Sequence, residues 1–153
     1  MHSLTARNRA DDEGPLSRES RYRSLVKKSP ATVIVVDDDA SIRRALRRQL
    51  QILGLNVLDF GSAEEFLACE LPDGNVCLLL DVYMPAMTGT ELCRKMVESG
   101  RSLPTILISG RDDLQTRKII REAKPIASLL KPFDEKSLLR AIRKALPGQN
   151  LPH

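Results

Sequence analysis

Short apolar segments and segments of helical periodicity alternate along the chain from Ala31 onward. The apolar segments are rich in β-branched residues, and such short continuous runs are typical of parallel strands that are buried on both faces of a sheet. We therefore predict strands at residues 32–36, 55–60, 76–80, 105–109 and 126–130.

The segment after the first predicted strand has the clearest helical pattern. Its apolar residues fall on one face and its arginines on the other, as expected of a helix that packs on a sheet with its polar side in water. The apolar face comprises Ile42, Ala45, Leu46, Leu50 and Leu53, and the basic face comprises Arg43, Arg44, Arg47 and Arg48.

The later helical segments are predicted from their ends and their spacing. Ser62 and Glu65 form a capping-box pattern, Asp134 is placed to cap the last helix, and Pro147–Gly148 ends it. The fourth segment, residues 112–123, has few apolar positions in phase, so we expect it to pack loosely. The apolar face of the third segment comprises Leu92, Cys93, Met96 and Val97.

Five strand–helix pairs with short connections predict an α/β domain built on a parallel sheet. A chain of 153 residues has room for one such domain and a short extension. We assign residues 31–147 to this domain and residues 148–153 to a C-terminal tail.

The net charge of +4 is concentrated at the N-terminus, where the first thirty residues carry seven Lys/Arg and four Asp/Glu. We interpret residues 1–30 as a disordered, solvated basic arm, because its basic residues are interrupted by acidic ones and Tyr22 is its only aromatic residue. The alternative is an arm that binds nucleic acid or an acidic partner.

Composition excludes several classes of protein. No apolar run approaches the roughly 20 residues of a membrane-spanning helix, and the first thirty residues contain no stretch of signal-peptide type. The three cysteines, Cys69, Cys77 and Cys93, are an odd number without a C-x-x-C pair, which argues against a disulfide framework or a zinc site. We therefore expect a cytoplasmic protein with unpaired thiols.

Charged and hydroxyl side chains follow the predicted strands at their carboxyl ends, where open parallel sheets bind ligands. Asp37 and Asp38 follow the first strand, Asp81 follows the third, Ser109 ends the fourth and Lys131 follows the fifth. If the first and third strands are neighbours, each pair of carboxylates at ~4 Å costs about 4 kcal/mol at an effective dielectric constant of 20. A Mg²⁺ ion would relieve that repulsion, and a lysine can hold an anion. The pattern thus predicts a phosphoryl-transfer site in which a carboxylate forms an acyl phosphate.

Four motifs at these strand ends also occur together in a known family. They are Val36-Asp37-Asp38, Leu80-Asp81-Val82-Tyr83-Met84-Pro85 with Met87 and Gly89, Ile108-Ser109-Gly110, and Lys131-Pro132-Phe133. From about Thr32 to Leu146 the chain resembles the CheY-like receiver domain of two-component response regulators. The resemblance implies a doubly wound, flavodoxin-like fold with five parallel strands in the order 2-1-3-4-5. Because few residues follow Leu146, we expect the stand-alone type without an output domain.

The resemblance implies a role for each matching residue. Asp81 would accept a phosphoryl group from a phosphohistidine on a sensor histidine kinase or a phosphotransfer protein. Asp38, Asp81 and the backbone carbonyl of Tyr83 would bind Mg²⁺, and Asp37 would act through a metal-bound water. Lys131 would contact the phosphoryl oxygens.

Further implications concern the neighbours of these residues. Ser109 would move inward to hydrogen-bond the phosphoryl group, and the Lys131–Pro132 bond would be cis, which an X-Pro bond allows at a cost of ~0.5–1 kcal/mol. Asp39 is interpreted as a helix cap rather than a ligand.

Two departures from the family pattern concern how a signal would leave the site. The position three residues before the lysine, usually Tyr or Phe in this family, is Ser128 here, so the aromatic half of the usual switch is missing. Lys124-Pro125 replaces a common Gly-Ala pair, and the proline disfavours helical geometry at Lys124.

Two surface features remain open at this stage. Tyr83 and Arg111 border the position of the attacking water in this family, and we predict that they slow hydrolysis of the acyl phosphate; the alternative is that both point into solvent. The face formed by Arg43, Arg44, Arg47 and Arg48 is either a solvated surface or a docking patch for a phosphohistidine domain.

The function predicted is a phosphorylation-dependent switch with output through protein–protein contacts, with no nucleic-acid or membrane partner. A receiver-like scaffold that needs no phosphate is the main alternative. An aspartyl-phosphate phosphatase is less favoured, because the residue two positions after Asp81 is Tyr83 and not a second acid.

Overall fold

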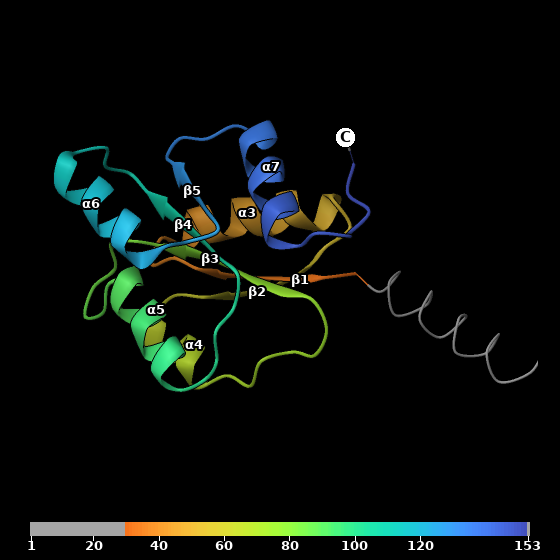
Figure 1. The fold of residues 1–153 in the computed structure, drawn as a ribbon. Coiled ribbons are helices and arrows are strands. Elements are labelled where there is room, and N and C mark those ends of the chain that lie inside the picture. The colour runs from red at the N-terminus through yellow and green to blue at the C-terminus, as the bar shows by residue number, and fades with distance from the viewer. Residues whose placement is uncertain (1–29, 153) are drawn as a thin grey trace, which may run out of the picture.

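The computed structural model describes residues 30–152, which form one five-stranded parallel sheet between layers of helices (Figure 1). The predicted basic arm, apart from Pro30, lies outside the described residues. The strand order is β2-β1-β3-β4-β5, so the predicted doubly wound topology is confirmed. The strands are β1 (Thr32–Val36), β2 (Asn56–Phe60), β3 (Val76–Asp81), β4 (Thr105–Ser109) and β5 (Ala127–Leu130).

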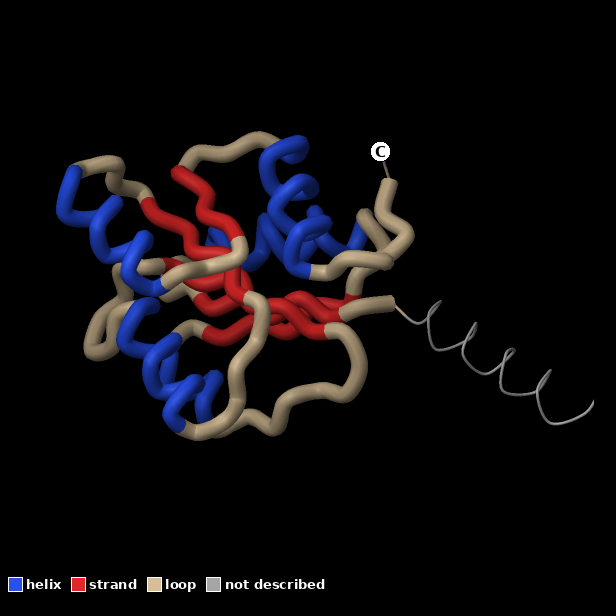
Figure 2. Tube along the Cα trace, in the orientation of Figure 1, coloured by secondary structure: helices blue, strands red, loops and turns tan. Residues whose placement is uncertain are grey.

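The helices cover both faces of the sheet, as Figure 2 shows. One face is packed by α3 (Ala40–Ile52) and α7 (Glu135–Ala145), and the other by α4 (Ala63–Leu67), α5 (Gly89–Glu98) and α6 (Leu114–Ala123). Each face has its own hydrophobic cluster, and the central strands β1 and β3 are buried along their whole length. This double burial is the reason that their sequences are continuously apolar.

Side-chain caps determine where the helices begin. Asp39, Asp113 and Asp134 each accept a hydrogen bond from a backbone N–H in the first turn of the following helix. The prediction that Asp39 and Asp134 are caps is therefore confirmed. The capping box of α4 is incomplete, because Ser62 accepts from the N–H of Glu65 while the Glu65 carboxylate accepts from Gly61.

The predicted apolar faces are correct except at their margins. Leu46 and Leu50 of α3 and Leu92 and Met96 of α5 are buried. Ala45, in contrast, is exposed, and Val97 is 65% exposed. Both residues lie at the edge of the apolar face of their helix, where the side chain no longer packs on the sheet.

The C-terminal residues pack more closely than a tail would. Leu151 is 8% exposed and belongs to the cluster beneath α3 and α7. Arg143 donates a hydrogen bond to the carbonyl of Pro152. The segment predicted as a tail therefore extends the core on this face.

Helix α6 packs mainly on α5 and leaves one side of the edge strand β5 uncovered. Ile126 and Leu130 are each 46% exposed, and Ser128 between them is also exposed. A cavity of about 210 Å³ lies between α6 and β5, beside Ser109 and Ser128. The expectation of loose packing in this segment agrees with Leu114, which is 82% exposed.

Two further observations concern the composition-based predictions. Cys77 is fully buried, and Cys69 and Cys93 are partly buried; all three are free thiols. Between residues 30 and 152, no helix combines the length and the apolar character that crossing a bilayer requires.

Candidate functional site

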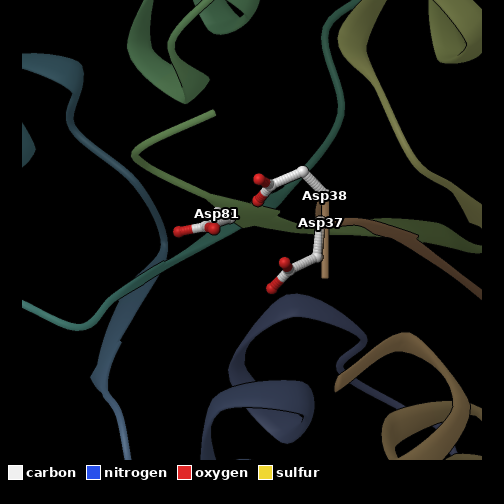
Figure 3. A group of neighbouring side chains, drawn as sticks. All are labelled: Asp37, Asp38 and Asp81. Carbon is white, nitrogen blue, oxygen red and sulfur yellow. The ribbon is translucent and has the colours of Figure 1, made fainter. Parts of the chain in front are cut away.

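Three carboxylates gather where β1 and β3 end. Because these strands are parallel neighbours, Asp37 and Asp38 after β1 lie beside Asp81 at the end of β3. One carboxylate oxygen from each lies within 4.8 Å of those of the other two, and all three side chains point toward a common space (Figure 3). Asp37 and Asp81 are buried, whereas Asp38 is exposed. The arrangement leaves an acidic cluster that is open on the side of Asp38.

Lys131 reaches this cluster from the end of β5. Its Nζ lies 2.9 Å from Oδ2 of Asp37 and 3.5 Å from Oδ2 of Asp81. Its backbone N–H donates to the carbonyl of Ser109 at 2.7 Å, which anchors it to the end of β4. The Lys131–Pro132 peptide bond is cis, in agreement with the prediction.

The electrostatics of the cluster centre on Asp81. The pKa of Asp81 is raised from 3.8 to about 6, first by burial and then by the charge of Asp37, while Lys131 and the N–H of Tyr83 act in the opposite direction. Burial by itself lowers the pKa of Lys131, but hydrogen bonds and charges from Asp37 and Asp81 raise it above its ordinary value. One lysine therefore compensates the buried negative charge incompletely.

These residues fit a magnesium ion. Mg²⁺ prefers hard oxygen ligands and uses one or two carboxylates while keeping several waters. The carboxylate oxygens of Asp37, Asp38 and Asp81 are close enough to share one ion, and the exposed side at Asp38 leaves room for water. The raised pKa of Asp81 shows that a second cation would be favourable there.

Ser109, the hydroxyl predicted for this site, is bonded to its own loop. Its side chain is 1% exposed. The Oγ accepts from the N–H of Arg111 at 2.9 Å and donates to the carbonyl of Arg111 at 3.0 Å. Ser109 therefore lies at the end of β4, and both hydrogen bonds of its hydroxyl are made to the backbone of Arg111.

Tyr83 and Arg111 contact each other, so the alternative that both simply point into solvent is wrong. The guanidinium carbon of Arg111 lies 4.5 Å from the centre of the Tyr83 ring, a cation–π distance. The Tyr83 hydroxyl is 2.6 Å from Oγ1 of Thr116, which is fully buried. The sequence analysis missed Thr116, although it lies in helical phase with Ile120 and Ala123 on the inner side of α6.

Two arginines of the predicted basic face are engaged in ion pairs. Arg43 donates to Asp59 at 3.2 Å and to the backbone carbonyl of Asp37 at 2.7 Å, and Arg47 also pairs with Asp59. Asp59, the partner of both arginines, lies in β2. The solvated face is therefore reduced to Arg44 and Arg48.

Gly89 sets the spacing behind the site. A Cβ atom at this position would lie 2.4 Å from the backbone carbonyl oxygen of Asp81 and 3.1 Å from Cα of Val82. Its N–H donates to the carbonyl of Val82 at 2.8 Å. Only glycine allows the start of α5 to approach the end of β3 so closely.

Comparison with known proteins agrees with this geometry. The family profile described as the response regulator receiver domain matches residues 33–143, which include every residue of the site. The chain belongs to this family. Receiver domains are signalling proteins of two-component systems rather than classical enzymes. The CheY-like fold seen here is the fold of this family.

Two curated relatives and one solved structure illustrate the similarity. The chain is 39% identical over 126 residues to the response regulator protein TmoT of Ectopseudomonas mendocina, covering 81% of this chain and 56% of TmoT. It is 36% identical over 112 residues to nodulation protein W of Bradyrhizobium diazoefficiens, covering 73% of this chain and 49% of that protein. A receiver protein from Burkholderia phymatum superimposes with a TM-score of 0.68 at 36% identity, covering 82% of this chain and all of that one.

The chain spans about half the length of the curated relatives it matches. The functions of the other half of these regulators therefore cannot be assigned to this chain from the match. The receiver domain is what this chain shares with them.

Proposed function

We propose that this chain is a phosphorylation-dependent signalling switch in which Asp81 is the phosphoacceptor. The observation that carries the proposal is the convergence of three carboxylates and Lys131 at one sheet edge, with Asp81 between the lysine and the open side at Asp38. A sensor histidine kinase or a phosphotransfer protein would supply the phosphoryl group as a phosphohistidine.

The transfer follows from the positions of these side chains. A carboxylate oxygen of Asp81 attacks phosphorus, the P–N bond to the donor imidazole breaks, and its electron pair returns to the imidazole nitrogen. Lys131 holds the charge that develops on the phosphoryl oxygens. When bound, Mg²⁺ neutralises the carboxylates and offsets phosphoryl charge.

The remaining residues position these groups. Asp38, Asp81 and the backbone carbonyl of Tyr83 are proposed as the direct Mg²⁺ ligands, with Asp37 acting through water. Asp37 also orients Lys131 through the 2.9 Å hydrogen bond. Ser109 is proposed to hydrogen-bond the phosphoryl group after leaving its bonds to Arg111.

The output is proposed to be a protein–protein contact made by the receiver domain. That the chain acts without nucleic acid stays a prediction, because the matched relatives are about twice as long as the shared region.

Hydrolysis of the acyl phosphate is proposed to be slowed by Tyr83 and Arg111. Their stacked side chains lie beside the acceptor loop, where they can shield the phosphoryl group from water. We expect Tyr83→Ala and Arg111→Ala to lose phosphate faster than the wild type, measured as the decay of the phosphorylated mass. Unchanged lifetimes in both variants would remove the shielding role.

Incubation with Mg²⁺ and acetyl phosphate, followed by intact mass measurement, tests the main proposal. The wild type should gain one phosphoryl group, Asp81→Asn should gain none, and Asp112→Asn, which removes an exposed carboxylate, should behave as the wild type. Absence of uptake in the wild type would favour the scaffold. Continuous donor consumption together with hydrolysis of unrelated phosphomonoesters would favour the phosphatase.

A further inference from the structure

The hydroxyl of Ser109 has only one hydrogen to donate, and here it is donated to the carbonyl of Arg111. If Ser109 donates to a phosphoryl oxygen on Asp81, as the proposed function requires, that bond to Arg111 is lost. Phosphorylation therefore changes the hydrogen bonding of the residue two positions beyond β4, whatever else it does.

Arg111 connects this change to a second residue. Its guanidinium stacks on the ring of Tyr83, and the hydroxyl of Tyr83 is bonded to Thr116 at 2.6 Å. Tyr83 also lies two residues after Asp81 and donates its N–H to Oδ1 of Asp81 at 3.4 Å. The ring is thus held between the acceptor loop, the loop after β4 and helix α6.

The other contacts of the first turns of α6 are local: Asp113 caps the helix by accepting from the N–H of Thr116, and Arg117 pairs with Asp112 in the preceding loop. Thr116 is its only buried residue, and its first residue, Leu114, is 82% exposed. The helix packs on α5 rather than on β5, and a cavity of about 210 Å³ separates it from Ser128 and Leu130. A change at the Tyr83–Thr116 bond is therefore expected to move α6 at small energetic cost.

We infer that Thr116 is a positioning residue that couples phosphorylation to helix α6 through the path Ser109–Arg111–Tyr83–Thr116. The inference rests on the proposed function and adds the route by which the site acts on the surface. It also explains how a signal could leave the site although Ser128 replaces the usual aromatic residue. β5 has no aromatic ring beside Ser109 that could carry the change.

A structural role alone gives a different expectation. If Thr116 merely satisfies a buried hydroxyl, its removal lowers stability equally with and without a bound phosphoryl group. If Thr116 couples the site to α6, its removal also abolishes the response of α6 to a phosphoryl mimic. The two roles differ in the response and not in stability.

The experiment compares amide hydrogen exchange in α6 with and without beryllofluoride and Mg²⁺, in the full chain. We expect a several-fold change in exchange of α6 amides in the wild type and in Thr116→Ser, which keeps the hydroxyl. Thr116→Val and Tyr83→Phe should lose the change, and the double variant should match either single one because both remove the same bond. Thr105→Val, which removes a hydroxyl that donates to the carbonyl of Leu103 at the other end of β4, is the matched control and should respond as the wild type.

The outcomes separate the path from the proposed function. A wild-type response that persists in Thr116→Val and Tyr83→Phe, or a wild type whose α6 does not respond, overturns the path. Phosphoryl uptake from acetyl phosphate, measured by mass on the same wild-type sample, reports independently on Asp81 as acceptor. If Thr116→Val fails to fold, Tyr83→Phe and Thr116→Ser still decide, because Tyr83→Phe leaves Thr116 intact and Thr116→Ser keeps its hydroxyl.

Discussion

Replacing Asp81 by asparagine should stabilise the metal-free protein at neutral pH. In the folded chain, burial and the charge of Asp37 disfavour the ionised form of Asp81 and raise its pKa from 3.8 to about 6. In the unfolded chain the carboxyl ionises freely. Since the folded-state pKa is the higher one, the contribution of this group to stability is complete below pH 3.8 and is lost as the pH rises through about 6.

The size of the effect follows from the shift. A difference of one pKa unit corresponds to about 1.4 kcal/mol, so the shift of Asp81 corresponds to a loss of roughly 3 kcal/mol above its folded-state pKa. Asp81→Asn cannot ionise and avoids this loss. The advantage of the variant in the free energy of unfolding should therefore grow by roughly 2.4 kcal/mol between about pH 4 and about pH 8, because a small part of the loss has already occurred at pH 4.

The assay is denaturant unfolding of both proteins in the presence of a chelator at the two pH values. Using the change with pH cancels effects of the substitution that do not depend on protonation. Asp73→Asn, which removes an exposed carboxylate, controls for the loss of one negative charge. A difference between Asp81→Asn and wild type that stays constant with pH, or that shrinks toward alkaline pH, would refute the electrostatic reasoning.

Three other changes test the surroundings of the site. Gly89→Ala should slow phosphoryl uptake and lower stability, because its Cβ would collide with the Asp81 carbonyl, whereas Gly110→Ala has open space and should behave as wild type in unfolding. Arg43→Ala should lower the free energy of unfolding by about 2 kcal/mol, since Asp59 and the Asp37 carbonyl lose a charged donor. The control Arg44→Ala, at an exposed position, should change it by no more than about 0.5 kcal/mol. Equal losses in the two variants would contradict the structural role of Arg43. Saturating Mg²⁺ should raise the stability of the wild type by about 2.7 kcal/mol at a hundred times its Kd, and a chelator should both reverse this and stop uptake; an unchanged melting temperature would argue against a metal site.

The strands and the acidic edge could be predicted because their cause is local. β1 and β3 are buried on both faces, so their sequences are apolar throughout, and the residues after them must lie at one sheet edge once the strands are parallel neighbours. The same logic placed Lys131 beside Asp37 and Asp81, which the structure brings to 2.9 and 3.5 Å.

What the sequence analysis missed depends on contacts between distant segments. Arg43 and Asp59 become partners only because α3 packs beside the end of β2, and no periodicity in either segment indicates it. Thr116 was overlooked because a threonine on the inner side of a helix with few apolar residues has no evident partner until Tyr83 is placed opposite it. The assignment of Val97 and Ala45 to buried helix faces was wrong, because a helical pattern does not show how far a sheet extends beneath the helix.

The edge strand β5 has a consequence for assembly. A free strand edge can recruit a strand from another molecule through its unpaired N–H and carbonyl groups. Here that edge is only four residues long, and Pro125 and Pro132, neither of which has an N–H to donate, stand close to its two ends. A continuous sheet across two copies of this chain would have almost no ladder to build on at β5, so any self-association on this side has to use side chains such as Ile126 and Leu130.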